Sequence, residues 1–306
     1  MRKRFLLLII MSSILVLAIG GGFLWLFFPL REEVLIISDN RYIENHIPVG
    51  EQWKLRFSLA SIGKKLSMET IEFDTLGDPD NLDTLISDSR TARTSLIVFS
   101  PLITSDIVLH QDVWTQRLSQ LHGEGISSVG IGVAPEGLFD LLFTYENSSS
   151  GWSEAAKALS LLSKDNPLPT VLLYTAGEVN AEANARLFEQ HYKERVLEVL
   201  PVSLSTRAAI DTTVEKLSDM GALYVVSPYV EGLAQYASET NDQKIRWIVD
   251  ASYTPVIQRR NLEGVVADDL GASLVELFSS GFENRSGGVS IRSPLFTTYR
   301  SMKRAW

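Results

Sequence analysis

From Arg31 to Trp306, short continuous apolar runs alternate with longer polar stretches that carry apolar residues at helical spacing. The clearest runs are Val34–Ile37, Leu96–Phe99, Ile126–Val133, Val171–Tyr174, Leu223–Val226 and Arg246–Val249. Apolar runs without alternation are typical of parallel strands that are buried on both faces. Because the segments between them have the length and period of helices, the pattern predicts an α/β fold, with parallel sheets covered by helices.

The remaining expected strands are Met68–Phe73, Leu138–Tyr145, Val196–Val202 and Gly264–Ala267. The expected helices are Trp53–Ile62, Pro79–Arg93, Val113–Leu121, Trp152–Ser163, Asn180–Arg195, Arg207–Met220, Glu231–Glu239 and Asp268–Phe278. About ten strands are many for one open sheet, so two sheets in two lobes fit ordinary domain sizes better. The serine-rich stretch Asn147–Gly151 is the best candidate for a linker between the lobes.

The first thirty residues contain the longest apolar run of the chain. After the basic start Arg2–Arg4, no charged residue occurs in Phe5–Leu30. As a helix, Phe5–Phe28 extends about 36 Å, enough to cross a hydrocarbon core of roughly 30 Å with some tilt. The basic start favours a cytoplasmic N-terminus, so the rest of the chain is expected outside the cytoplasm. The alternative is a cleaved signal peptide ending near Ala18–Gly20, although the apolar core of such peptides has only about 7–15 residues.

The charge balance and the lack of cysteine exclude several kinds of site. The net charge is −9 at pH 7, and because the three N-terminal bases contribute +3, the rest of the chain carries −12. Phosphate binding needs clustered Lys and Arg, so a nucleic-acid partner is disfavoured. A sequence without cysteine has no disulfide, no thiolate metal site, no cysteine nucleophile and no cysteine-linked lipid anchor.

The sequence shows no recognisable catalytic or cofactor motif. It contains no GxSxG, no GxxxxGKS/T and no GxGxxG after an expected strand. The four histidines, His46, His110, His122 and His191, lack metal-ligand spacing and are expected at the surface or in loops. The pair Asp268-Asp269 precedes an expected helix, where carboxylates cap free N–H groups. We therefore expect a non-enzyme that holds neither metal nor cofactor.

A different pattern indicates a binding site. Polar or aromatic residues follow directly after the expected strands, and ligands of open α/β sheets bind outside the carboxyl ends of the strands. The candidate ligand-binding residues are Asn40, Tyr42, Ser100, Asn147, Glu178, Tyr229 and Asp250. Asp250 is the strongest candidate, because a carboxylate accepts hydrogen bonds from ligand hydroxyl or ring N–H groups. Tyr42, Trp152 and Tyr229 offer rings that stack on a flat ligand face.

The order of several stretches along the sequence resembles that of a known fold. They are Ser38–Tyr42, Tyr145–Gly151, Arg246–Asp250 and Gly264–Leu277, followed by the tail Val289–Ser301. In this order they resemble the type 1 periplasmic binding protein fold, which is shared by sugar-binding proteins, the LacI-type regulator core and the basic membrane protein family of nucleoside receptors. The resemblance covers roughly Arg31 to Trp306.

The resemblance implies two Rossmann-like lobes, which follow the membrane-spanning anchor expected at residues 1–30. The first lobe would comprise residues 31–147 and 266–286, and the second residues 148–265 and 287–306. It further implies an interlobe cleft that closes on a small polar ligand, with hinges near Ser148, Val265 and Gly287. Polar residues of the sugar binders are replaced at Val133–Pro135, and those of the nucleoside receptors at Ala251–Ser252. The ligand class therefore stays open between a sugar and a nucleoside-like molecule.

Two functions follow from this resemblance. The first is a membrane-tethered solute-binding protein that delivers its ligand to the permease of an ABC-type uptake system. The second is a ligand-sensing receptor or adaptor that signals through a separate membrane partner, such as a sensor kinase. A DNA-binding regulator is disfavoured, because the apolar segment stands where a helix-turn-helix would precede the core.

Overall fold

The structure is a computed structural model that describes residues 31–145, 150–163, 168–176, 179–192, 196–202, 207–228, 245–253, 261–282 and 291–302. The expected anchor at residues 1–30 and the expected helix Glu231–Glu239 lie outside the described residues. Within the described residues, no helix has the length and apolar character needed to cross a membrane.

The described chain forms two six-stranded sheets. The first has the strand order β11-β5-β4-β3-β1-β2 and the second the order β12-β10-β9-β8-β6-β7. The strands of the first sheet are β1 (Glu32–Asp39), β2 (Lys64–Ile71), β3 (Thr94–Phe99), β4 (Ser127–Ile131), β5 (Leu141–Thr144) and β11 (Ile291–Pro294). Those of the second are β6 (Thr170–Thr175), β7 (Val196–Val202), β8 (Tyr224–Ser227), β9 (Arg246–Asp250), β10 (Leu262–Asp268) and β12 (Thr297–Ser301).

Parallel pairing dominates both sheets, as the apolar runs predict. Strands β1 to β4 pair in parallel in the first sheet, and β6 to β10 do so in the second. Strand β12 is antiparallel to β10 and closes one edge of the second sheet. The α/β fold expected from the sequence is therefore confirmed.

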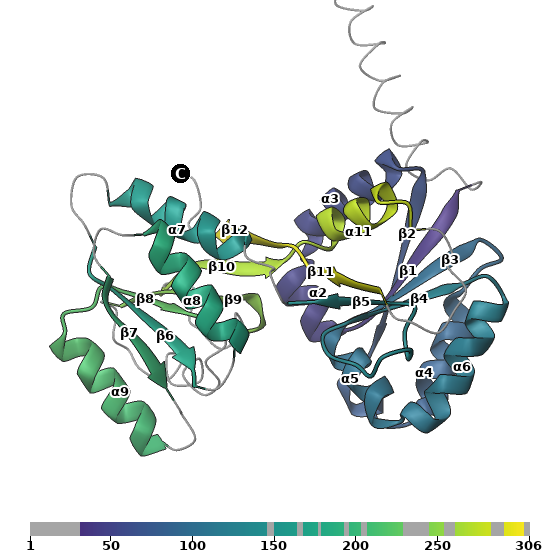
Figure 1. The fold of residues 1–306 in the computed structure, drawn as a ribbon, viewed down its shortest axis with the longest axis horizontal. Helices are drawn as coiled ribbons and strands as arrows, with labels where there is room; N and C mark the ends of the chain where they lie inside the picture. The colour runs from purple at the N-terminus through teal and green to yellow at the C-terminus, as the bar shows by residue number, and fades with distance from the viewer. Residues whose placement is uncertain are drawn as a thin grey trace, which may run out of the picture. The chain divides into compact units, whose positions relative to one another are not determined.

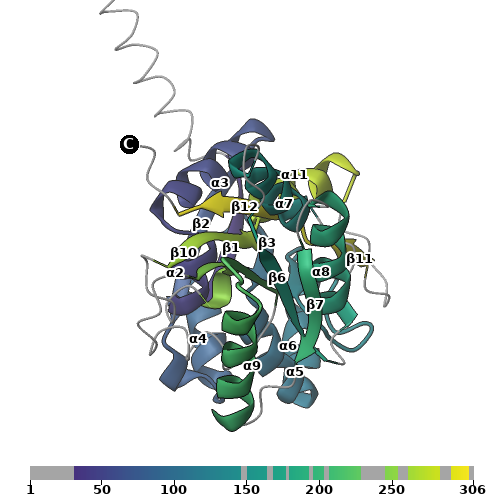
Figure 2. The ribbon, with the colours of Figure 1, turned by 90° about the vertical axis from the view of Figure 1, so that its left-hand side faces the viewer.

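The helices cover the sheets as the sequence pattern predicts. They are α2 (Asn40–His46), α3 (Val49–Ser61), α4 (Pro79–Ser89), α5 (Pro101–Leu109), α6 (Gln111–Gly123), α7 (Ser150–Leu162), α8 (Val179–His191), α9 (Arg207–Asp219) and α11 (Leu270–Ser279). Figure 1 shows α3 and α11 on one face of the first sheet and α4, α5 and α6 on the other. In the second sheet, α7 and α8 pack on one face and α9 packs on the opposite face. Figure 2 shows α9 beside β6 and β7.

The chain divides into two compact units that exchange segments. Unit 1 comprises the described residues up to Asn40, Val49–Leu142 and Leu274–Ile291. Unit 2 comprises Arg41–Pro48, Phe143–Ser273 and the described residues from Arg292 onward. Most of helix α2 thus belongs to unit 2, although it directly follows the first strand of unit 1. The lobe boundaries implied by the resemblance stay a prediction.

Tight packing of helix α7 against the second sheet requires a glycine. A Cβ atom at Gly151 would lie 2.6 Å from Val266 Cγ1 and 3.0 Å from the backbone nitrogen of Thr298. Neither atom belongs to the flexible end of a long side chain, so the backbone must shift to admit a methyl group. Trp152, the next residue, is buried in the core of unit 2 rather than available for ligand stacking.

We predict that Gly151→Ala lowers the free energy of unfolding by about 1–3 kcal/mol, because overpacking a filled core has this cost. Gly123→Ala is the matched control, since a Cβ at Gly123, also a helical glycine, meets nothing within 4 Å. The control is expected to be neutral or stabilising by up to about 1 kcal/mol. Thermal denaturation of both variants checks this, and equal effects would contradict the packing assigned to α7.

Candidate functional site

Two buried carboxylates end neighbouring parallel strands of unit 2. Asp250 is the last residue of β9 and Asp268 the last residue of β10, and each is 5% exposed. Carboxyl ends of parallel strands lie at the same edge of a sheet, which is where α/β proteins bind ligands. This edge of the second sheet is therefore the candidate functional site.

Asp268 is the centre of a hydrogen-bonded cluster. Its Oδ2 accepts hydrogen bonds from the hydroxyl of Tyr42 at 2.7 Å and from that of Tyr145 at 3.2 Å. The Nδ1 atom of His46 lies 3.4 Å from the same oxygen. Burial raises the pKa of Asp268 to about 6, while the two tyrosine hydroxyls and the charge of Arg300 act in the opposite direction.

Helix α2 supplies two members of this cluster and is fixed by several contacts. The rings of Tyr42 and His46 stack with centroids 4.6 Å apart. The guanidinium of Arg300, on β12, donates to the carbonyl oxygens of Asn45 and His46 at the end of the helix. The seven-residue helix is thus bound to β10 and β12 through side chains that are far away in the sequence.

Asp250 lies next to this cluster. Its Oδ1 accepts a hydrogen bond from the backbone nitrogen of Ser252 at 3.0 Å. Burial raises its pKa; a positive charge on His46 lowers it, and the negative charge of Asp268 raises it further. The side chain of Ser252 approaches Nε2 of His46 at 3.1 Å, and Ser252 itself is exposed. The cluster therefore reaches solvent on the Ser252 side.

Ser252, His46 and Asp268 lie in a row, as the three residues of a serine hydrolase triad do. The imidazole ring of His46, however, has its proton on the nitrogen that a triad needs unprotonated. The backbone N–H of Asp268 donates to His46 Nδ1 at 3.2 Å, so the neutral ring carries its proton on Nε2. A triad needs the reverse arrangement, in which Nε2 accepts the serine proton and Nδ1–H donates to the carboxylate. The arrangement favours a binding or structural role over nucleophilic catalysis.

The carboxyl edge of the first sheet, in unit 1, carries a smaller hydrogen-bonded group. The hydroxyl of Ser100 donates to Asp39 Oδ2 at 3.1 Å, and both residues are buried. Asn40, the next residue after Asp39, is exposed at the start of α2. Ser100 therefore has a hydrogen-bond partner within unit 1, and Asn40 faces solvent.

The structure places four of the seven predicted site residues. Tyr42 and Asp250 are brought into one region of unit 2, while Asn40 and Ser100 take the positions just described. The other three, Asn147, Glu178 and Tyr229, lie outside the described residues. Their roles, like those of the whole predicted set, stay predictions.

Two sequence-based expectations are corrected here. His46 was expected at the surface or in a loop, but it is buried between Tyr42 and Asp268. Asp268 was expected to cap a helix, but only Asp269 does so, with its Oδ1 accepting from the Ala272 nitrogen at 2.9 Å. The missed signal is that Asp268, like Asp250, follows a continuous apolar run.

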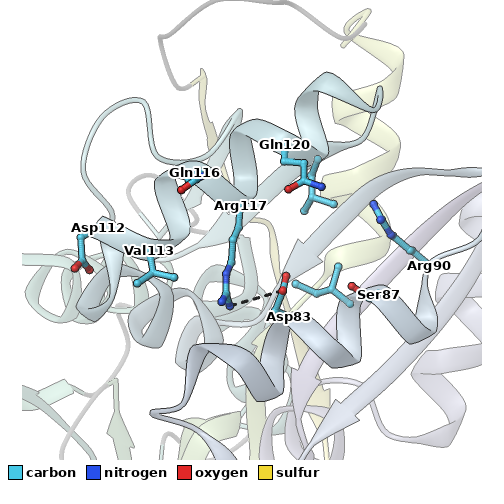
Figure 3. Close-up of a pocket in the computed structure, with 10 residues that line it drawn as sticks. Asp83, Ser87, Arg90, Asp112, Val113, Gln116, Arg117 and Gln120 are labelled. Carbon is cyan, nitrogen blue, oxygen red and sulfur yellow. Dashed lines mark ion pairs between the residues drawn. The ribbon is translucent and has the colours of Figure 1, made fainter.

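A hollow of about 510 Å³ lies elsewhere in unit 1, between α4 and α6. Figure 3 shows Arg117 crossing this hollow toward Asp83. The guanidinium of Arg117 is engaged by Asp80 at 2.6 Å and by the carbonyl oxygen of Pro79 at 2.6 Å. These contacts join two helices, so we assign the hollow a structural role. Within the described residues, no group of three or more His, Cys, Asp or Glu side chains is arranged to hold a metal ion.

The chain matches no protein-family model and no curated protein sequence. Among solved structures it is similar to AraP, an arabinose-binding protein from Geobacillus stearothermophilus, with 12% identity and a TM-score of 0.51 over 89% of this chain and 97% of that one. It is also similar to a mutant XylFII–LytSN complex, with 12% identity and a TM-score of 0.52 over 88% of this chain and 98% of the matched chain.

At this level of identity the similarity concerns the fold. The two six-stranded sheets, each mainly parallel and flanked by helices, agree with it along almost the whole described chain. The chain therefore has the type 1 periplasmic binding protein fold.

Proposed function

We propose that this protein is a membrane-tethered, extracytoplasmic solute-binding protein, and not an enzyme. It binds a small polar ligand, a sugar or a nucleoside-like molecule, at the carboxyl ends of β9 and β10. The observation that carries the proposal is the pair of buried carboxylates, Asp250 and Asp268, at the edge of the sheet where this architecture binds ligands.

Asp250 is the proposed ligand acceptor. A carboxylate offers about four lone-pair positions, of which the Ser252 amide uses one. Asp268 instead receives two tyrosine hydroxyls, which makes it the better support for α2. We therefore assign hydroxyl recognition to Asp250, and positioning of Tyr42 and His46 to Asp268.

The neighbouring structures support a sugar as the first ligand class to test. AraP is an arabinose-binding protein, and its fold matches 89% of this chain. A closed site that pairs ligand hydroxyls discriminates strongly against molecules that lack them. Delivery to the permease of an ABC-type uptake system remains the proposed role of the bound ligand.

The tether rests on the sequence. The uncharged run Phe5–Leu30 follows three bases, which favours an anchor with the domain outside the cytoplasm. Extraction of membranes with alkaline carbonate separates the two alternatives for this segment. An uncleaved anchor keeps the full-length chain in the membrane pellet, whereas a cleaved signal releases a shortened chain.

A ligand-sensing receptor or adaptor is the second candidate function. The XylFII–LytSN structure is a complex of two proteins, and its matched chain has this fold along 98% of its length. Such a receptor would bind its ligand at the same edge of sheet and pass the signal to a separate membrane partner. Co-purification of a sensor protein, in place of a permease, would favour this candidate.

A thermal-shift panel of pentoses, hexoses, nucleosides and purines tests the proposal. We expect at least one member to stabilise the full-length chain in detergent. At a concentration 100 times its dissociation constant, a ligand stabilises the folded state by about 2.7 kcal/mol. For a protein of this size that is roughly 5–10 °C in Tm. If no member raises Tm, the assignment of a sugar or nucleoside-like ligand is wrong.

A further inference from the structure

Helix α3 of unit 1 presents an apolar stripe on its outer side. Val49, Trp53 and Phe57 are 70%, 40% and 54% exposed. They are spaced four residues apart and so lie on one face of the helix. Buried residues of the same helix, Leu55 and Leu59, already provide the face that packs on the sheet. Helix α3 therefore has a second apolar face, which stays partly exposed.

The stripe is a contiguous surface rather than three scattered residues. The rings of Trp53 and Phe57 have centroids 6.5 Å apart. Apolar side chains that gather on one exposed surface mark interaction sites more often than single exposed ones do. Tryptophan is also among the residues that contribute most to binding energy at protein interfaces.

The position of α3 restricts what can cover this stripe. The guanidinium of Arg31 donates to the carbonyl oxygen of Ala60, in the last turn of α3, at 3.2 Å. Arg31 directly follows the apolar run proposed as the anchor. Phe57 lies about one turn before Ala60, and a helix of 13 residues is about 20 Å long, so the stripe starts near Arg31 and extends away from it along α3.

We propose that the occupant is α3 of a second copy of this chain. Anchors in one membrane orient all copies in the same way and hold each α3 at the same distance from the bilayer. A two-fold axis along the membrane normal then brings identical stripes together, as an isologous interface requires. Confinement to the membrane also raises the effective concentration of one copy near another.

Charge favours the α3 face over the rest of the surface for this contact. The body of the chain carries a net charge of −12 after the three N-terminal bases are set aside, so the overall charge of two copies opposes their association. Helix α3 carries one acid, Glu51, and two bases, Lys54 and Arg56. Glu51 pairs with Lys54 at 2.8 Å within the helix. Two α3 faces therefore meet without an excess of acidic groups.

Residues four apart form a ridge, and two such ridges pack at a crossing angle of about −50°. Trp53 stands at the centre of the stripe and so at the expected crossing point, with Val49 and Phe57 on either side.

The proposal rests on the tether for the orientation of the two copies, but it concerns a surface separate from Asp250. Its failure would leave solute binding untouched, and loss of solute binding would leave this contact untouched.

Cysteine cross-linking of the full-length chain in membranes tests this contact, because the natural chain has no cysteine. Phe57→Cys is expected to give a dimer with a short bismaleimide about tenfold faster than Ser119→Cys. Ser119 is the control, since it is exposed on α6, which covers the opposite face of the sheet. Adding Trp53→Glu to Phe57→Cys is expected to reduce cross-linking to the level of the control.

Equal rates for Phe57→Cys and Ser119→Cys would overturn the proposal. A Phe57→Cys product whose mass is not twice that of the chain would also overturn it and would indicate a different protein partner. The thermal melting curve of the Trp53→Glu variant shows whether it remains folded. If it does not, Val49→Glu, at the most exposed position of the stripe, replaces it as the disruptive change.

Discussion

Replacing Asp268 with alanine is expected to lower the free energy of unfolding by about 2–4 kcal/mol at pH 7. The change removes the acceptor of the Tyr42 and Tyr145 hydroxyls and leaves a cavity beside His46. A buried polar group that loses its partner has a cost of about 1–3 kcal/mol. Relief of the buried charge offsets part of this loss. Chemical denaturation followed by tryptophan fluorescence measures the effect.

Asp269→Ala is the matched control for this prediction. Asp269 is the next residue in the chain and carries the same side chain, but among the described residues its carboxylate caps α11 through the Ala272 nitrogen. Loss of a helix cap has a cost of about 1 kcal/mol. An Asp269→Ala loss as large as that of Asp268→Ala would contradict the role assigned to the cluster.

Replacing Asp268 with asparagine is expected to have the opposite effect at pH 7 and to flatten the dependence of stability on pH. The pKa of Asp268 is about 6 in the folded chain, against 3.8 for the free side chain. Between these values the folded state binds a proton that the unfolded state lacks, so the free energy of unfolding falls as pH rises. A pKa difference of this size corresponds to roughly 3 kcal/mol in the free energy of unfolding, and this stabilisation is lost as pH rises from about 4 to about 6.

Asparagine keeps an oxygen acceptor for Tyr42 but does not titrate. Asp268→Asn should therefore be more stable than the natural chain at pH 7 and should lose less stability between pH 4 and pH 6. Part of the slope should remain, because burial raises the pKa of Asp250 in the same direction. Unfolding curves at pH 4.5, 5.5 and 7 check this. A slope that Asp268→Asn leaves unchanged would show that this carboxyl does not titrate in the range.

The strands could be predicted from the sequence because buried parallel strands are continuous apolar runs. Strand β7, for example, has the predicted bounds Val196–Val202. Two helices were missed for different reasons. Helix α5 is apolar on most of its sides and therefore lacks a helical period, although Ser100 followed by Pro101 is a helix-start signal. Helix α2 is short and polar, and contacts with distant strands stabilise it.

The candidate site could be predicted only in part. Asp250 follows an apolar run, which predicts a site residue, and the structure places it at the carboxyl edge of the second sheet. Asp268 also follows such a run, but its neighbour Asp269 made helix capping the simpler interpretation. The partners of Asp268 on α2 are more than 220 residues away in the sequence. Contacts over such separations leave no trace in a single sequence, so the cluster appears only in the folded chain.

The measurement that tests the central claim most directly is the affinity of the full-length chain for a sugar or nucleoside that stabilises it, determined by isothermal titration. Asp250→Ala is expected to raise the dissociation constant about 10- to 150-fold, because a buried hydrogen bond to a charged group contributes about 1.5–3 kcal/mol and the ligand hydroxyls lose their acceptor. Asp219→Ala, an exposed change at the end of α9, should leave it within about twofold. An Asp250→Ala chain that binds as tightly as the Asp219→Ala chain would show that the ligand does not bind at the carboxyl end of β9.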